Sequence, residues 1–185
     1  MPNWAYTSYR IVGKNEEVQD LYSKIQQLQS MENPLVENGF GNLWLGNLVT
    51  ILGGDWNKIY CRGKIIDFSL DDGILSIETE TAWSEMAEVR HFIEKTYPAL
   101  KIYYYEEECG CEIYQTNDQH GHFFSSRYIF DDQESEGMEY FDKSGTLLAF
   151  ASRAMGIKFK SIEELEDAVG ESDGFSFHVI KVVDD

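Results

Sequence analysis

Acidic side chains gather in several short stretches, and two of these stretches fall on expected strands. Glu78 and Glu80 are two residues apart and therefore share one side of a strand, while Glu106–Glu108 end another strand. Converging carboxylates of this kind bind Mg²⁺ or act as general acids and bases. A solvated strand face explains the same residues without any chemistry, since 33 of the 185 residues are Asp or Glu. Both interpretations stay open at this point.

Two pairs of metal-ligating residues, Cys109 with Cys111 and His120 with His122, suggest a zinc site because zinc prefers thiolates and imidazoles. In the hairpin that we expect over 111–130, however, Cys111 lies about four residues from the position opposite His122. That separation is too large for one ion, so we expect no metal and no cofactor. The cysteines are then small, reduced core residues. A different turn would bring all four side chains together, and that alternative stays open.

A run of three tyrosines, Tyr103–Tyr105, must place aromatic rings on both faces of its strand, because strand side chains alternate. Open aromatic faces stack single-stranded bases when Lys and Arg surround them, but here glutamates are the neighbours. The pattern therefore favours an interaction surface for something other than nucleic acid. The residues of this candidate surface are Glu78, Glu80, Tyr103, Tyr105, Glu106, Glu107 and Glu108.

The charge balance also argues against binding to nucleic acid. The 33 acidic residues exceed the 15 basic ones by 18, so the formal net charge is −18 and a phosphate backbone would be repelled. A hydrophobic content of 43% suffices for a sizeable core. The chain has neither an apolar run near the ~20 residues of a membrane span nor a signal-peptide pattern, so we expect a cytoplasmic protein that does not bind membranes.

Hydrophobic periodicity in the first 115 residues predicts the order strand, helix, strand, strand, helix, strand. Asn15 and Ser84 are the expected N-caps of the two helices, and Asp71-Asp72-Gly73 is a strong hairpin signal. This order is that of the split βαβ, or ferredoxin-like, plan, an α+β fold with both helices on one face of an antiparallel sheet. The expected elements are strands 4–12, 59–70, 74–82 and 100–109, helices from Asn15 to Asn33 and from Ser84 to Tyr97, and a short helix near 42–52.

The remaining residues, 116–185, are expected to extend the same sheet, so that residues 1–185 form a single domain. Ser161 and Glu164 form a capping box at the start of the last helix. The expected elements are a hairpin of 111–116 with 122–130, a strand near 138–142, helices 146–155 and 161–169, and a strand over 175–183.

Several short motifs in residues 1–115 resemble those of the YubB-type ferredoxin-like proteins, a family of uncharacterised bacterial proteins often encoded on plasmids and phages. The motifs are Met1-Pro2-Asn3-Trp4 before a strand that ends at Gly13, Gly53-Gly54-Asp55-Trp56, Thr81-Ala82-Trp83-Ser84, and Tyr97-Pro98 before a strand that ends Tyr105-Glu106-Glu107. Ala5 and Thr7 depart from the family pattern. The resemblance implies the ferredoxin-like fold and no activity, with Asn3, Trp4, Gly13, Trp56, Thr81, Trp83 and Pro98 as framework residues.

Two functions from different classes fit these observations. In the first, the chain is a non-catalytic acidic module that binds a basic protein partner, in one version by imitating nucleic acid. In the second, it is a metal-dependent hydrolase that uses the carboxylates of Glu78, Glu80 and Glu106–Glu107. The sequence lacks phosphate-binding loops and hydrolase or metalloprotease motifs, which favours the first function. We expect a monomer or a weak homodimer.

Overall fold

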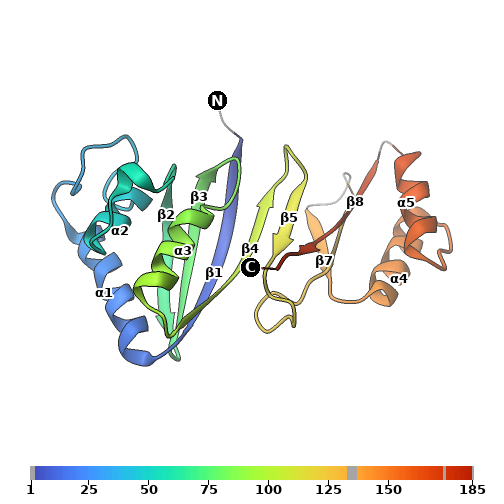
Figure 1. The fold of residues 1–185 in the computed structure, drawn as a ribbon. Helices are drawn as coiled ribbons and strands as arrows, with labels where there is room; N and C mark the ends of the chain where they lie inside the picture. The colour runs from blue at the N-terminus through green and yellow to red at the C-terminus, as the bar shows by residue number, and fades with distance from the viewer. Residues whose placement is uncertain (1–2, 133–136, 173, 185) are drawn as a thin grey trace. The chain divides into compact units, whose positions relative to one another are not determined.

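A computed structural model of the chain describes residues 3–132, 137–172 and 174–184 (Figure 1). These residues form a mixed α+β structure with five α-helices and two sheets, so the predicted fold class is confirmed at this level. The contacts divide the chain into two compact units, Met1–Ile113 (unit 1) and Tyr114–Asp185 (unit 2), and each is described by itself. Continuation of one sheet through both units stays a prediction. None of the described helices combines the length and apolar character needed to cross a bilayer.

The four strands of unit 1 are β1 (Trp4–Gly13), β2 (Gly63–Asp71), β3 (Ile74–Ala82) and β4 (Leu100–Glu108). They lie in the order β2-β3-β1-β4, and every neighbouring pair is antiparallel. The predicted hairpin joins β2 to β3 through Asp72 and Gly73, whose φ angles of 47° and 78° suit a tight two-residue turn.

Three helices belong to unit 1, namely α1 (Asn15–Ser30), α2 (Leu45–Ile51) and α3 (Ala87–Thr96). Both longer helices cover the same face of the sheet (Figure 1). On that face Tyr22 of α1 contacts Phe68 of β2, and Arg90 of α3 lies over Tyr104 of β4. The face is apolar along β1, where Tyr9 and Ile11 are buried. Among the described residues of unit 1, no helix covers the opposite side of the sheet.

Both predicted N-caps are wrong. Asn15 is the first residue of α1, with Lys14 before it, and α3 begins at Ala87, three residues after Ser84. The chain first turns at Trp83, whose φ is 73°, and the Thr81 hydroxyl donates to the Ser84 carbonyl at 2.8 Å. This turn uses the residues that would otherwise have begun the helix.

Gly13 ends β1 where no side chain fits. A Cβ at this position would lie 2.2 Å from the carbonyl oxygen of Ala99, and its φ of +150° is one that other residues rarely adopt. We therefore expect Gly13→Ala to lower the free energy of unfolding by about 2–4 kcal/mol in urea titrations. Gly39→Ala is the control, because its Cβ would meet nothing within 4 Å, and it should change stability by about 0.5 kcal/mol or less. Equal effects of the two substitutions would contradict the close approach at Gly13.

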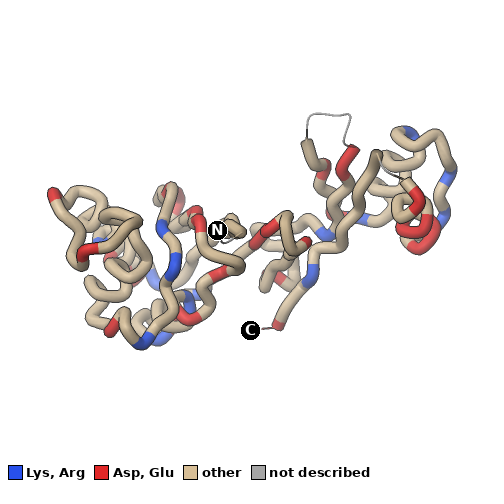
Figure 2. The backbone as a smooth tube through the Cα atoms, turned by 90° about the horizontal axis from the view of Figure 1, so that it is seen from above, with Lys and Arg blue, Asp and Glu red and all other residues tan. Residues whose placement is uncertain are grey.

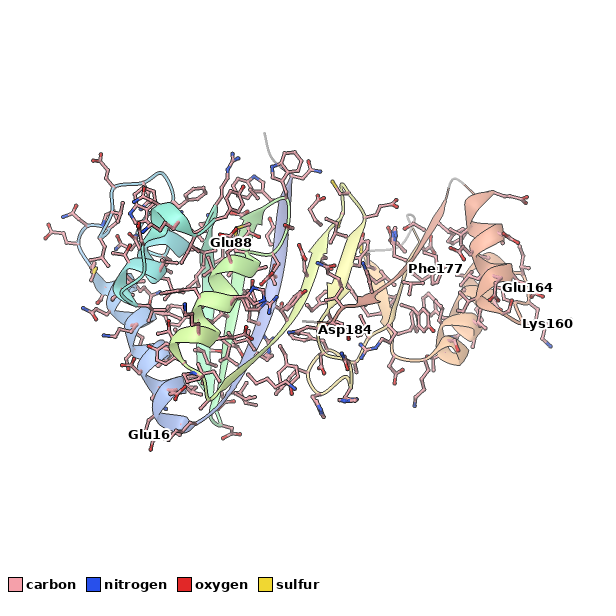
Figure 3. All side chains as sticks on the ribbon, in the orientation of Figure 1. Glu16, Glu88, Lys160, Glu164, Phe177 and Asp184 are labelled. Carbon is pink, nitrogen blue, oxygen red and sulfur yellow. The ribbon has the colours of Figure 1, made fainter. Side chains whose placement is uncertain are left out.

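Unit 2 contains a three-stranded antiparallel sheet in the order β7-β6-β8 and a parallel pair, β5 with β9. Phe177 of β8 lies between this sheet and its two helices (Figure 3). The core of the unit consists of Phe130, Leu147, Ala151, Phe159 and Leu165. The elements are β5 (Ile113–Thr116), β6 (Tyr128–Asp132), β7 (Met138–Phe141), α4 (Ser144–Met155), α5 (Ile162–Gly170), β8 (Phe175–Val179) and β9 (Lys181–Val182).

The predicted hairpin of 111–116 with 122–130 is wrong. The Asp118 carboxylate accepts hydrogen bonds from the backbone amides of Phe123 and Phe124 at 2.7 and 3.0 Å, so the chain folds into a loop there. β6 pairs instead with β7 and β8. The capping box is confirmed in part. The Ser161 hydroxyl accepts from the Glu164 amide at 3.3 Å, while the Glu164 carboxylate accepts from the amide of Lys160 rather than Ser161.

Candidate functional site

The side of the unit 1 sheet opposite the helices is its open face. The strand register places Glu78 and Glu80 of β3 on this face, together with Tyr105 and Glu107 of β4. Tyr6 of β1 lies opposite Glu80 on one side and Glu107 on the other. Polar and aromatic side chains on the open face include Tyr6, Ser8, Arg10, Lys64, Asp67, Glu78, Glu80, Lys101, Tyr103, Tyr105 and Glu107.

Hydroxyl groups orient the carboxylates of the open face. The Tyr6 hydroxyl donates to Glu80 Oε1 at 3.3 Å, and the Tyr105 hydroxyl donates to Glu107 Oε2 at 3.0 Å. Ser8 donates in the same way to Glu78. Tyr6 itself is 50% exposed. An aromatic ring between two carboxylates is an arrangement that attracts guanidinium and ammonium groups, since the ring face and both carboxylates favour positive charge.

Two cations of unit 1 already bind to this face. Arg10 Nη1 lies 3.0 Å from Glu78 Oε1, and Lys64 Nζ lies 3.2 Å from Glu80 Oε2. All four side chains are partly exposed, and such pairs contribute about 1 kcal/mol or less. Figure 2 accordingly shows both signs of charge in unit 1, whereas the acidic residues of α5 in unit 2 form a dense group.

The expectation that Glu106–Glu108 form one exposed strip is wrong. Glu107 points to the open face, but Glu106 and Glu108 point to the other side and are buried. The alternation of side chains along β4 separates them. Tyr103 shares the open face and is 8% exposed. The structure therefore brings Glu78, Glu80, Tyr105 and Glu107 together with Tyr6, and it places Glu106 and Glu108 elsewhere.

Beneath the helices, Glu106 belongs to a buried polar cluster that sequence reasoning missed. Its Oε1 accepts from the Glu85 amide at 2.6 Å. The Glu85 carboxylate accepts in turn from Arg90 Nε at 2.9 Å and from the Tyr9 hydroxyl at 3.2 Å. Arg90, 4% exposed, also lies over the ring of Tyr104. A signal was present in the sequence, because Arg90 lies three residues before Ile93, on the apolar side of α3.

Burial controls the protonation of this cluster. It raises the pKa of Glu85, an effect that Arg90 opposes and Glu106 strengthens. Burial also raises the pKa of Tyr9, and the Glu85 carboxylate adds to the rise. The raised pKa of Tyr9 keeps its phenol neutral, and its hydroxyl donates to Glu85 within a cluster that is closed to solvent.

The cysteines do not all lie in the core. Cys61 is buried, but Cys109 and Cys111 are exposed, because they follow the end of β4 in a turn around the Glu108 carboxylate. All three are free thiols. Within the part of the chain that the structure describes, His, Cys, Asp and Glu side chains form no group of three that could hold a metal ion. The acidic group Asp131–Glu136 lies partly outside the described residues, which end at Asp132 and resume at Gly137.

The framework residues implied by the family resemblance lie mainly at the ends of unit 1 elements. The Asn3 carbonyl accepts from the Trp83 amide at 2.9 Å, and Thr81 is fully buried. Trp83 itself is 47% exposed, so it does not fill the core. Trp4 contacts Phe40, Trp56 contacts Trp44, Gly13 approaches Ala99, and Pro98 is exposed after α3.

Comparisons with known proteins give no relative. No family model, curated protein or solved structure matches this chain.

Proposed function

We propose that the chain is a non-catalytic acidic module that binds a basic protein partner through the open face of unit 1. We further propose that unit 1 is ferredoxin-like and related to the YubB-type proteins. The strand order β2-β3-β1-β4 with two helices on one face supports the fold, and the short motifs described above support the relationship.

The single observation that carries the functional proposal is the position of Tyr6 between Glu80 and Glu107 on neighbouring strands. An arginine or lysine of the partner would lie over the exposed ring and bind a carboxylate on either side. The Glu80 carboxylate already binds one ammonium group, that of Lys64. Because this internal pair is weak and partly exposed, a partner cation can replace it at little cost.

The alternative, a metal-dependent hydrolase, has no comparable support. Glu78 and Glu80 share a face, but each binds a different cation, Arg10 and Lys64 respectively. Glu106, which that alternative needs, points to the opposite side of the sheet.

Direct titration with a short arginine-rich peptide tests the proposal. We expect calorimetry to give an affinity that falls as salt is added, because exposed charges are screened. Glu80→Lys with Glu107→Lys should weaken binding by about tenfold or more, since it places like charges against the peptide.

The matched control is Glu16→Lys with Glu37→Lys, which changes the net charge equally at exposed positions outside the sheet. It should retain most of the affinity. Equal weakening by both double variants would mean that net charge alone attracts the peptide. The proposal that the open face is the binding surface would then be contradicted. In a narrower version of the proposal, the open face imitates nucleic acid. Duplex DNA should then compete with the chain for a DNA-binding protein that the chain has captured.

A further inference from the structure

An open groove of about 500 Å³ in unit 1 uses none of the open-face residues. Its volume falls within the ~300–1,000 Å³ that is typical of small-molecule sites. Aromatic side chains form most of its lining, namely Phe40, Trp44, Trp56 and Tyr60, and Lys58 and Arg62 add positive charge. The groove therefore combines flat apolar surfaces with cations.

The aromatic lining is held in place by its neighbours. Trp44 and Trp56 meet at a ring-centroid distance of 5.3 Å and an interplanar angle of 67°, so their indoles form a corner. The six-membered ring of Trp44 lies over Gly46, where a Cβ would come within 2.3 Å of it. Phe40 packs edge-on against Trp4. A ligand ring would thus meet a surface that is already formed, which reduces the entropy lost on binding.

The loop that carries the cations is also anchored. Asp55 accepts a hydrogen bond from the Asn57 amide at 3.1 Å, which caps the short 3₁₀ helix Trp56–Lys58. The Tyr60 amide donates at 2.7 Å to Glu88, which lies near the start of α3 (Figure 3). These bonds fix the backbone on both sides of Lys58.

The charged side chains that line the groove are cations. The described lining residues include Lys58 and Arg62 but no Asp or Glu, in a protein of net charge −18. Arg62 is exposed and makes no ion pair with any residue that the structure describes. Lys58 pairs with exposed Asp55 at 3.2 Å, and the Glu88 carboxylate bonds the Tyr60 amide beside the groove. Arg62 is therefore the cation that is available to an anionic ligand.

A second, independent observation is the indole N–H of Trp44. It is buried and donates to no acceptor in the described part of the chain. Buried donors normally have a hydrogen-bond partner, so Trp44, a residue of the groove lining, carries an unsatisfied donor.

We propose that this groove binds a small planar aromatic anion of the nucleoside monophosphate class. The ring stacks in the corner that Trp44 and Trp56 form, and the phosphate binds Arg62 with Lys58 beside it. The remaining charge of the chain repels a polymeric phosphate backbone, so the ligand is a mononucleotide rather than a nucleic acid strand.

Calorimetric titration of the full chain with AMP, adenosine and inorganic phosphate tests this inference. We expect AMP to bind. Adenosine and inorganic phosphate should each bind about tenfold more weakly, because adenosine lacks the phosphate group and inorganic phosphate lacks the aromatic ring. Arg62→Gln should weaken AMP about tenfold and leave adenosine unchanged. Trp56→Leu should weaken both, and circular dichroism checks that this variant is folded.

Arg153→Gln is the matched control, since it removes the same charge from an exposed position on α4 and should leave the affinity for AMP unchanged. Three outcomes would overturn the inference. These are no binding of AMP at millimolar concentration, equal effects of Arg62→Gln and Arg153→Gln, and tighter binding of oligodeoxyadenylate than of AMP.

Discussion

Glu106→Lys should unfold the protein, whereas the same substitution at the next residue, Glu107→Lys, should leave it folded. The Glu106 carboxylate is fully buried and accepts the Glu85 amide at 2.6 Å. A lysine there would bury a positive charge, remove this acceptor and approach the cluster that contains Arg90. Disruption of buried charge networks typically costs about 3–5 kcal/mol. Glu107 lies on the open face, where a single charge contributes about 1 kcal/mol or less.

Urea unfolding followed by circular dichroism measures both effects. Glu106→Gln is the informative third variant, because it retains an oxygen acceptor without the charge, and we expect a smaller loss than for lysine. Similar unfolding midpoints for the two lysine variants would show that Glu106 is not buried as described.

Removal of Arg90 should cost about 3–5 kcal/mol and should couple strongly to Glu85. Arg90→Met leaves the buried Glu85 carboxylate without the guanidinium that lies 2.9 Å from it. In the double variant with Glu85→Gln, the charge that Arg90 pairs with is also removed, so the loss should be smaller than the sum of the two single losses. Lys95→Met, which removes an exposed cation from the same helix, should change stability by about 0.5 kcal/mol or less.

The loss in Arg90→Met should also depend on pH. Burial already raises the folded-state pKa of Glu85 above its usual 4.5, and Arg90 opposes the rise, so the variant has a still higher value. Between 4.5 and the raised value, the folded state binds more protons than the unfolded state, and stability therefore falls as pH increases. The loss relative to the unmodified protein should be smallest near or below pH 4.5 and should grow above it. A loss that is constant with pH would contradict the proposed interaction.

Regular elements were well predicted where local signals agree. The alternation of Ala5, Tyr9 and Ile11 identified the buried side of β1. The Asp-Gly pair identified the β2–β3 hairpin, because positive φ at both turn positions is a local requirement. The hydrophobic stripe of α1 is likewise a property of a single segment.

Predictions were less successful where a segment could form either of two local structures. Ser84 is a good cap in isolation, but the turn at Trp83 precedes the helix and uses that residue. Residues 122–127 alternate enough to suggest a strand, yet Asp118 binds their backbone amides and forms a loop. In both cases a contact with a nearby residue prevailed over the propensity of the segment.

The sequence by itself determined the α+β class and the excess of 18 negative charges. It placed Glu106, Glu107 and Glu108 on one surface, although side chains alternate along a strand. Only the tertiary structure decided which of these glutamates faces solvent. The helices α1 and α3 pack on one side of the sheet and bury Glu106 there, where the Glu85 backbone amide donates to its carboxylate. The open face remains on the other side because no helix of unit 1 covers it, and that choice depends on packing between segments far apart in the sequence.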